Sequence, residues 1–396
     1  MKVYIIGTGV NSRCSLTREA VESIENSQIL IGAERMLAEY SGCGKKLVNA
    51  YKPEDICGIL RSSSYNTAAV LMSGDCGFFS GTKKLLPLIE DMKPVIISGI
   101  SSAAYFCGRI NMSYETMKFV SLHGKNANIA VNVRMNEKCF FLLGGDMNAA
   151  DVCQKLCEFG LSDVTVHIGE NLGYENEICR SGQARDFINI HTEKLSVLVT
   201  ENPGHLRHVP SAISDSEFIR DSIPMTKSAV RGNIVSGLNI CHDSVCWDIG
   251  CGTGSVSVEM AFRCPDGKVL AFDKKLEAAE LTARNAQKFG CDNIFVHEGI
   301  CPDVLKNVSA PDKVFVGGSS GNMEKIFECA YQKNEFADIT VSAVSLETLE
   351  QAVKAFERFG REYSVMQIAV TETRKVGSHT MLTAQNPVFI IKGRRS

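Results

Sequence analysis

Two stretches of the chain share one pattern of hydrophobic and polar positions. Each begins with an apolar run that enters a glycine-rich turn, MKVYIIGTGV at residues 1–10 and VCWDIGCGTG at residues 245–254. An amphipathic stretch follows in each case, at residues 16–24 and 255–264. This combination is typical of a buried parallel strand that leads through a tight turn into a helix. The chain therefore starts an α/β unit twice.

Further apolar runs extend both units. In the first half, a helix is expected at residues 149–159, and strands are expected at residues 68–74, 94–99, 140–145, 164–170 and 195–203. In the second half, strands are expected at residues 269–272, 314–318, 339–346, 364–370 and 387–393. The second order is consistent with a seven-stranded sheet whose last strands form a hairpin.

The alternation of expected strands and helices is interrupted by one polar segment. Residues 204–224 contain histidines, serines and prolines, and a helix is expected to begin near Thr226. We therefore expect a domain at 1–203, a linker at 204–223 and a second domain at 224–396.

The second glycine turn is the strongest indication of a ligand. Its spacing is D-x-G-x-G-x-G, and Asp273 ends the next apolar run, where a carboxylate typically binds a ribose diol. The absence of G-x-G-x-x-G favours S-adenosylmethionine over a dinucleotide. Asp248 either holds the turn or contacts the cofactor. The residues expected to bind the cofactor here are Asp248, Gly250, Cys251, Gly252, Thr253, Gly254, Asp273, Gly299 and Ile300.

The first half also places small and polar residues at the ends of its expected strands. Open α/β sheets bind ligands at the carboxyl ends of their strands. A second cofactor site is therefore expected there. Its residues are Gly7, Gly9, Gly74, Asp75, Ser101 and Ser102, and Asp146 follows a later strand.

Composition narrows the function classes. The net charge of −3 gives no sign of a nucleic-acid-binding surface, and no apolar run is long enough for a membrane span. The sixteen cysteines include no C-x-x-C pair, so we expect buried thiols rather than a metal site. His205 and His208 could ligate zinc, but a plain linker is the favoured interpretation. A cytoplasmic location fits such thiol use.

Both halves resemble known families. VYIIGTGV, VLMSGDCGFFSG and VHIGENLGYENEICRSG in the first half resemble the tetrapyrrole methylases that act on corrin precursors. PMTKSAVRG, WDIGCGTGSVSVEMA and DKVFVGGSSGNMEKIF in the second half are similar to the C(15)-methyltransferases of cobalamin synthesis. Their order along one chain resembles the precorrin-6Y C(5),C(15)-methyltransferases (decarboxylating).

The resemblance implies a fold and an activity. The expected fold is α/β, with an N-terminal tetrapyrrole methylase fold of two α/β subdomains followed by a Rossmann-like seven-stranded S-adenosylmethionine-dependent methyltransferase domain. The expected activity is methylation of a precorrin or cobalt-precorrin at carbons 5 and 15, with loss of the ring C acetate carboxyl. A homo-oligomer is also expected. A ring carbon is the nucleophile, and no residue of the sequence is singled out as a general base for the proton that this carbon loses.

The resemblance also assigns residues outside the glycine turns. It places Thr226 at the cofactor, and Lys227 and Arg231, four residues apart on one helix face, at the substrate carboxylates. His123 is expected to contact substrate. The sequence departs from the family at Cys76, where a proline is usual, and at Lys125, where an arginine is usual.

Two other functions stay open at this point. The strand, glycine turn and acidic residue would also suit a nicotinamide-linked oxidoreductase. The first glycine turn has Val10 and Asn11 where the family commonly carries a further glycine or proline. Such a turn would suit a non-catalytic S-adenosylmethionine-binding protein.

Overall fold

The computed structural model describes residues 1–11, 15–123, 127–145 and 147–394, so Lys125 and Asp146 lie outside the described residues. The chain forms two compact units. Unit 1 consists of residues 1–125, 138–152 and 164–201, and unit 2 consists of residues 126–137, 153–163 and 202–396.

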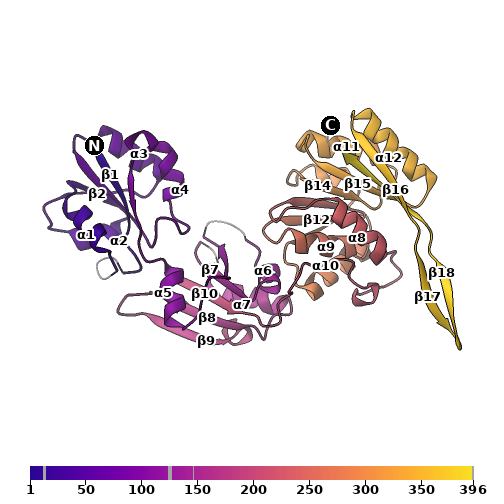
Figure 1. Ribbon diagram of the computed structural model, residues 1–396, viewed down its shortest axis with the longest axis horizontal. Helices are drawn as coiled ribbons and strands as arrows, with labels where there is room; N and C mark the ends of the chain where they lie inside the picture. The colour runs from indigo at the N-terminus through magenta and orange to yellow at the C-terminus, as the bar shows by residue number, and fades with distance from the viewer. Residues whose placement is uncertain (12–14, 124–126, 146, 395–396) are drawn as a thin grey trace. The chain divides into compact units, whose positions relative to one another are not determined.

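Unit 1 begins with a parallel five-stranded sheet of order β3-β2-β4-β1-β5 (Figure 1). Its three inner strands β2, β4 and β1 are largely buried because apolar clusters cover both faces of the sheet. The elements of this part are β1 (Lys2–Gly7), α1 (Arg18–Glu25), β2 (Ile29–Gly32), α2 (Glu34–Leu37), β3 (Lys46–Asn49), α3 (Pro53–Ser62), β4 (Thr67–Met72), α4 (Thr82–Leu85) and β5 (Val95–Ile97).

A second five-stranded sheet completes unit 1, with order β6-β7-β10-β8-β9. Only the β6–β7 pair is parallel, and the other pairs are antiparallel. The two sheets agree with the two α/β subdomains expected from the sequence. The elements are α5 (Ser102–Arg109), β6 (Lys118–Ser121), β7 (Lys138–Leu142), β8 (Thr165–Glu170), β9 (Ile178–Gln183) and β10 (Ser196–Glu201).

Unit 2 is built on a seven-stranded sheet of order β13-β12-β11-β14-β15-β19-β16. The first five strands are parallel, and β19 runs antiparallel to both of its neighbours. This confirms the expected Rossmann-like sheet and its closing hairpin. The strands are β11 (Val245–Ile249), β12 (Lys268–Asp273), β13 (Ile294–Glu298), β14 (Lys313–Val316), β15 (Asp338–Ala343), β16 (Glu362–Ile368) and β19 (Val388–Arg394).

Helices cover both faces of this sheet. One apolar cluster joins the sheet to α11 (Met323–Lys333) and α12 (Leu346–Arg358), and it contains Trp247 and Ile249. The opposite cluster contains Cys246 and joins α8 (Ser228–Gly237) and α9 (Ser255–Arg263), with α10 (Leu276–Phe289) beside α9. Alternate residues of β11 therefore face opposite helix layers, as the two-residue period of a strand requires.

Segments from the first half of the sequence belong to unit 2. They include α6 (Ala130–Met135) and the later part of α7 (Ala149–Glu158). The Asp292 carboxylate accepts hydrogen bonds from the backbone N–H groups of Ile129, Ala130 and Val131 at 2.7–3.0 Å. These contacts give α6 its N-terminal cap. The expected domain bounds of 1–203 and 224–396 stay a prediction.

An isolated hairpin extends from the seven-stranded sheet (Figure 1). It consists of β17 (Thr371–Val376) and β18 (His379–Ala384), and every residue of both strands is exposed. The sequence pattern did not predict this pair. Among the described residues, no helix has both the length and the apolar character needed to cross a membrane.

Candidate cofactor and substrate sites

The second glycine turn joins β11 to α9 and requires its glycines. Gly250, Gly252 and Gly254 have φ values of +77°, +58° and +74°, in the left-handed region that favours glycine. A Cβ atom on Gly250 would lie 2.7 Å from the backbone nitrogen of Gly318 after β14. The segment after β14 therefore packs directly against Gly250, and a Cβ atom does not fit at that position.

Asp248 lies in β11, two residues before the first glycine of this turn. It faces the same side of β11 as Cys246, and its Oδ2 atom accepts a hydrogen bond from the Ser257 hydroxyl of α9. Burial raises the pKa of Asp248 to about 7. Among the described residues, Asp248 Oδ1 and the hydroxyl of Thr253 are buried without a hydrogen-bond partner. Orphaned polar atoms beside a glycine cradle suit a polar ligand such as an amino-acid end.

Asp273 ends β12 beside the turn. Its Oδ2 atom accepts a hydrogen bond from Gly252 N at 3.0 Å, and its Oδ1 atom accepts one from Lys275 N at 3.1 Å. Each carboxylate oxygen has a second lone pair, so the group can hold the turn and still accept from a diol. Gly299 N donates to the Asp273 carbonyl at 2.8 Å, and Ile300 is 54% exposed. The structure thus brings these sequence-predicted residues to one sheet edge.

The residues expected at the substrate take different positions. Helix α8 begins at Ser228, two residues after Thr226, and Asp215 caps it by accepting from Ser228 N at 3.0 Å. Lys227 Nζ lies 3.4 Å from Asp215, and its side chain is 41% exposed. Lys227 therefore keeps a charge that a substrate could reach.

Arg231 corrects our expectation. Its side chain is fully buried, with Nε 2.6 Å from Glu259 Oε1 and Nη1 2.6 Å from the Thr226 carbonyl. Nη2 donates to the Ile213 carbonyl, and the guanidinium lies over the Phe218 ring. Arg231 has a structural role inside unit 2 and does not face a substrate.

The first glycine turn lies at the carboxyl edge of the parallel sheet of unit 1. Gly9 and Gly74 exchange backbone hydrogen bonds at 3.0 and 3.1 Å. A Cβ atom on Gly7 would lie 2.6 Å from Gly99 N and 2.7 Å from the Gly74 carbonyl oxygen. The ends of β1, β4 and β5 therefore meet with no room for side chains.

The polar residues at this edge also hold the backbone. Asp75 accepts from Gly77 N at 2.8 Å and from Gly99 N at 3.1 Å. Ser101 is the N-cap of α5 and accepts from Ala104 N at 3.1 Å, so Ser102 is the first residue of that helix. His123 is exposed. Cofactor or substrate binding by these residues stays a prediction.

Two further residues give detail that the sequence did not. Cys76, at the position where a proline is usual, is buried and lies 3.6 Å from the Ile5 carbonyl and 3.5 Å from the Ile97 carbonyl. Arg35 is an exposed cation beside the turn, and it donates to the Ser73 hydroxyl at 2.7 Å. Sequence reasoning missed Arg35 because only the fold brings α2 to the end of β4.

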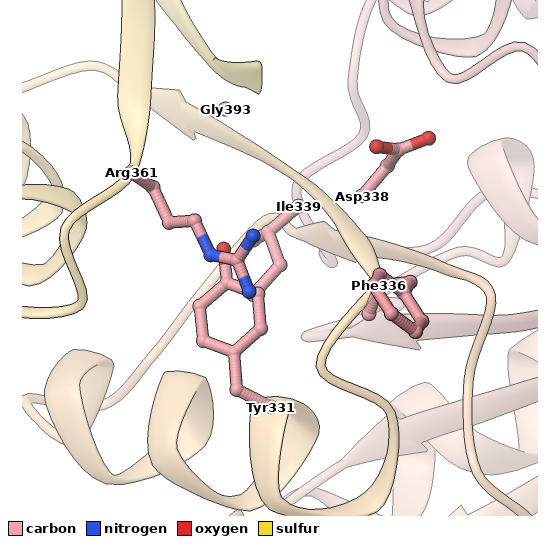
Figure 2. A pocket seen from close by; sticks show the side chains of 7 residues that line it. Tyr331, Phe336, Asp338, Ile339, Arg361 and Gly393 are labelled. Atoms are coloured by element: carbon pink, nitrogen blue, oxygen red, sulfur yellow. The ribbon is translucent and has the colours of Figure 1, made fainter. Parts of the chain in front are cut away.

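A small pocket at the opposite edge of the unit 2 sheet takes no part in these sites (Figure 2). Arg361 lies over the ring of Tyr331, with its guanidinium carbon 4.6 Å from the ring centroid. Asp338, which begins β15, lines the same pocket. Because β15 is parallel to β11, its first residue lies at the edge away from the glycine turn.

Two family models match this chain. Residues 2–187 match the tetrapyrrole (corrin/porphyrin) methylases, and residues 216–395 match the precorrin methyltransferase domain. Methyltransferases of these families use S-adenosylmethionine.

Curated relatives match the second half. A probable cobalt-precorrin-6B C(15)-methyltransferase (decarboxylating) of Pyrobaculum calidifontis is 41% identical over 182 residues, which are 45% of this chain and 93% of that protein. The corresponding protein of Saccharolobus solfataricus is 35% identical, over 48% of this chain and 98% of that protein. A solved structure, precorrin-6Y C5,15-methyltransferase from Geobacter metallireducens, is 33% identical, covers 48% of this chain and all of that one, and has a TM-score of 0.46.

The two family matches lie one after the other and account for most of the sequence. The chain therefore belongs to the precorrin methyltransferases, as a fusion of a tetrapyrrole methylase domain with a domain of the cobalt-precorrin-6B C(15)-methyltransferase (decarboxylating) family.

Proposed function

We propose that this chain carries out two S-adenosylmethionine-dependent methylations of one tetrapyrrole in cobalamin biosynthesis. The first half methylates carbon 5, and the second half methylates carbon 15 and releases the ring C acetate carboxyl as carbon dioxide. The observation that carries the proposal is the pair of glycine turns, one at the carboxyl edge of a parallel sheet in each unit. The names of the curated relatives favour the cobalt-loaded substrate.

The residues of unit 2 fit the cofactor. We propose that Asp248 and the turn from Gly250 to Gly254 hold its amino-acid end, that Asp273 accepts from its ribose, and that Ile300 covers its adenine. S-adenosylmethionine supplies a methyl group on a positively charged sulfur. The protein aligns the acceptor carbon with that methyl group and excludes water, which is catalysis by proximity.

The remaining site assignments are proposals of the same kind. In unit 1, Gly7, Gly9, Gly74, Asp75, Ser101 and Ser102 form the expected cofactor site, and His123 contacts substrate. In unit 2, Thr226 faces the cofactor and Lys227 binds a substrate carboxylate. Nothing favours a nicotinamide-linked oxidoreductase or a non-catalytic binding protein, since both matched families are methyltransferases.

Product analysis with one variant tests this function. Purified protein is incubated with S-adenosylmethionine and either the metal-free or the cobalt-loaded precursor, and products are identified by mass spectrometry. The wild type should add two methyl groups and remove one carbon dioxide. Asp273→Ala should lose a charge-assisted hydrogen bond worth about 1.5–3 kcal/mol, so carbon-15 methylation should fall about ten- to a hundredfold while carbon-5 methylation continues. Equal loss of both methylations would contradict the two-site assignment.

We also propose that the protein is a cytoplasmic homo-oligomer. Its many buried single cysteines suit a reducing compartment. The exposed hairpin β17–β18 suits contact with a second copy, because an isolated two-stranded hairpin is marginally stable in water.

A further inference from the structure

The segment before α8 lies against the helices that support the second glycine turn. We call residues 210–225 the strap. The backbone N–H groups of Ala212 and Ile213 donate to the two oxygens of Glu259 in α9, at 3.1 and 3.0 Å. Phe218 is buried, and its ring centroid lies 4.7 Å from that of Phe289 in α10. The strap is therefore fixed to two helices along its first half.

One buried amide joins the strap to the glycine turn. Asn285 of α10 is fully buried. Its Oδ1 atom accepts from Ile219 N at 2.8 Å, and its Nδ2 atom donates to the Ile219 carbonyl at 3.0 Å and to the Thr253 carbonyl at 2.8 Å. The amide thus satisfies both backbone groups of one strap residue and also holds a residue of the turn.

Beyond Ile219, the strap passes over the turn. A Cβ atom on Gly252 would lie 3.1 Å from the carbonyl oxygen of Pro224 and 3.7 Å from the side chain of Ile223. The strap is therefore a neighbour of the central glycine, and it leads directly into Thr226 and Lys227. Its position decides how much space the turn offers to a ligand.

We propose that Asn285 is a positioning residue for the cofactor of the second half. It acts through the strap and the turn, fixing both in the arrangement that binds the cofactor. Because the strap and the turn are already ordered by folding, cofactor binding does not have to supply the entropy cost of ordering them. The inference rests on the proposed function, because it assumes that S-adenosylmethionine occupies this turn.

Asn293 supplies a matched control in the same unit. It is also fully buried, and its Nδ2 atom donates to the carbonyls of Ala261 and Cys264, each at 2.9 Å. These bonds hold the end of α9 and reach neither the strap nor the turn. Asn293→Ala removes similar bonds from a similar environment, so it reproduces the general loss of stability.

Steady-state kinetics on the full chain tests the proposal. Carbon-15 methylation is followed at varied S-adenosylmethionine concentration for the wild type, Asn285→Ala and Asn293→Ala. Asn285→Ala should raise the KM for S-adenosylmethionine about tenfold, because it removes bonds that preorganise the site, and should change kcat by less than about threefold. Asn293→Ala should leave that KM within about twofold of wild type.

Limited trypsin digestion gives a second readout, since Arg220 is an exposed residue of the strap. Cleavage after Arg220 should be faster in Asn285→Ala than in Asn293→Ala, and S-adenosylhomocysteine should slow it in the wild type. If Asn285→Ala does not fold, Asn285→Ser, which keeps a hydroxyl in place of the amide, is measured in the same way. Its KM for S-adenosylmethionine should exceed that of the wild type and of Asn293→Ala, by less than about tenfold.

The outcomes separate the two proposals. An equal KM in Asn285→Ala and wild type, or an equal rise in both alanine variants, would overturn the role of Asn285. A wild-type chain that neither methylates carbon 15 nor is protected by S-adenosylhomocysteine would instead overturn the proposed function of the second half.

Discussion

Asp248 is a carboxyl group whose charged form is disfavoured by folding. Burial raises its pKa from 3.8 to about 7. Because the folded state then binds the proton more tightly, the stabilisation is complete below about pH 4 and is lost as the pH rises toward about 7. Relative to Asp248→Asn, the wild type should lose about 1.4 kcal/mol of unfolding free energy per pH unit between about pH 5 and 7. Urea unfolding across this range checks this, and a constant difference would contradict it.

Arg231 and Lys227 should respond differently to removal. Arg231→Ala leaves Glu259 buried without its cation, so the free energy of unfolding should fall by about 3–5 kcal/mol. Lys227→Ala removes a half-exposed ion pair and should cost less than about 1 kcal/mol, while raising the KM for the tetrapyrrole. Chemical unfolding and substrate kinetics on both variants test this. A stable Arg231→Ala protein with a raised tetrapyrrole KM would restore the original expectation for Arg231.

The sequence could predict some of these residues because their requirement is local. A left-handed turn selects glycine, so Gly250, Gly252 and Gly254 were recognisable from spacing alone. Arg231 was placed on the correct helix, but spacing only says that it shares a face with Lys227. What covers that face is decided by Ile213 and Glu259, which are distant in sequence. Long-range pairing of this kind leaves no signal in one sequence.

At the scale of elements, the polar composition of residues 204–223 predicts a linker, and the bounds of that linker stay a prediction. In the structure, part of this segment is the strap, which packs against helices of unit 2. Backbone N–H and C=O groups of the strap form hydrogen bonds with the side chains of Glu259 and Asn285, which belong to other elements. They do not form the repeating backbone hydrogen bonds of a helix or a sheet. Periodicity cannot reveal such an element, because its partners follow no repeat.

The strap should therefore decide where unit 2 can be truncated. A fragment of residues 202–396 keeps Ile213 and Asp215, whereas a fragment of residues 220–396 leaves Glu259 and Arg231 without these partners. Each lost bond to a buried charge is worth about 1.5–3 kcal/mol, so the longer fragment should unfold at a clearly higher temperature. Thermal unfolding followed by circular dichroism compares them. Equal melting temperatures would show that the strap adds no stability.

At the scale of the molecule, the outer hairpin sets the expected assembly. Its strands are exposed along their whole length, and its apolar residues Val376, Met381 and Leu382 are 49%, 53% and 75% exposed. Within the described residues, β17 and β18 pair only with each other, so each has a free edge that could accept another strand. A second copy offers the same edge, which permits a symmetric contact.

Removing the hairpin should prevent the proposed homo-oligomer from forming and should leave unit 2 folded. Ile368 of β16 and Val388 of β19 are paired across the sheet, so a short glycine–serine turn can replace the residues between them. Light scattering after gel filtration should give the mass of an oligomer for the wild type and of one chain for the deletion. Leu382→Lys should weaken association, because it places charge on an apolar contact. The deletion variant should have the same circular dichroism spectrum as the wild type, which would confirm that its sheet is intact. A wild type that is itself a monomer would contradict the assignment of the hairpin to self-association.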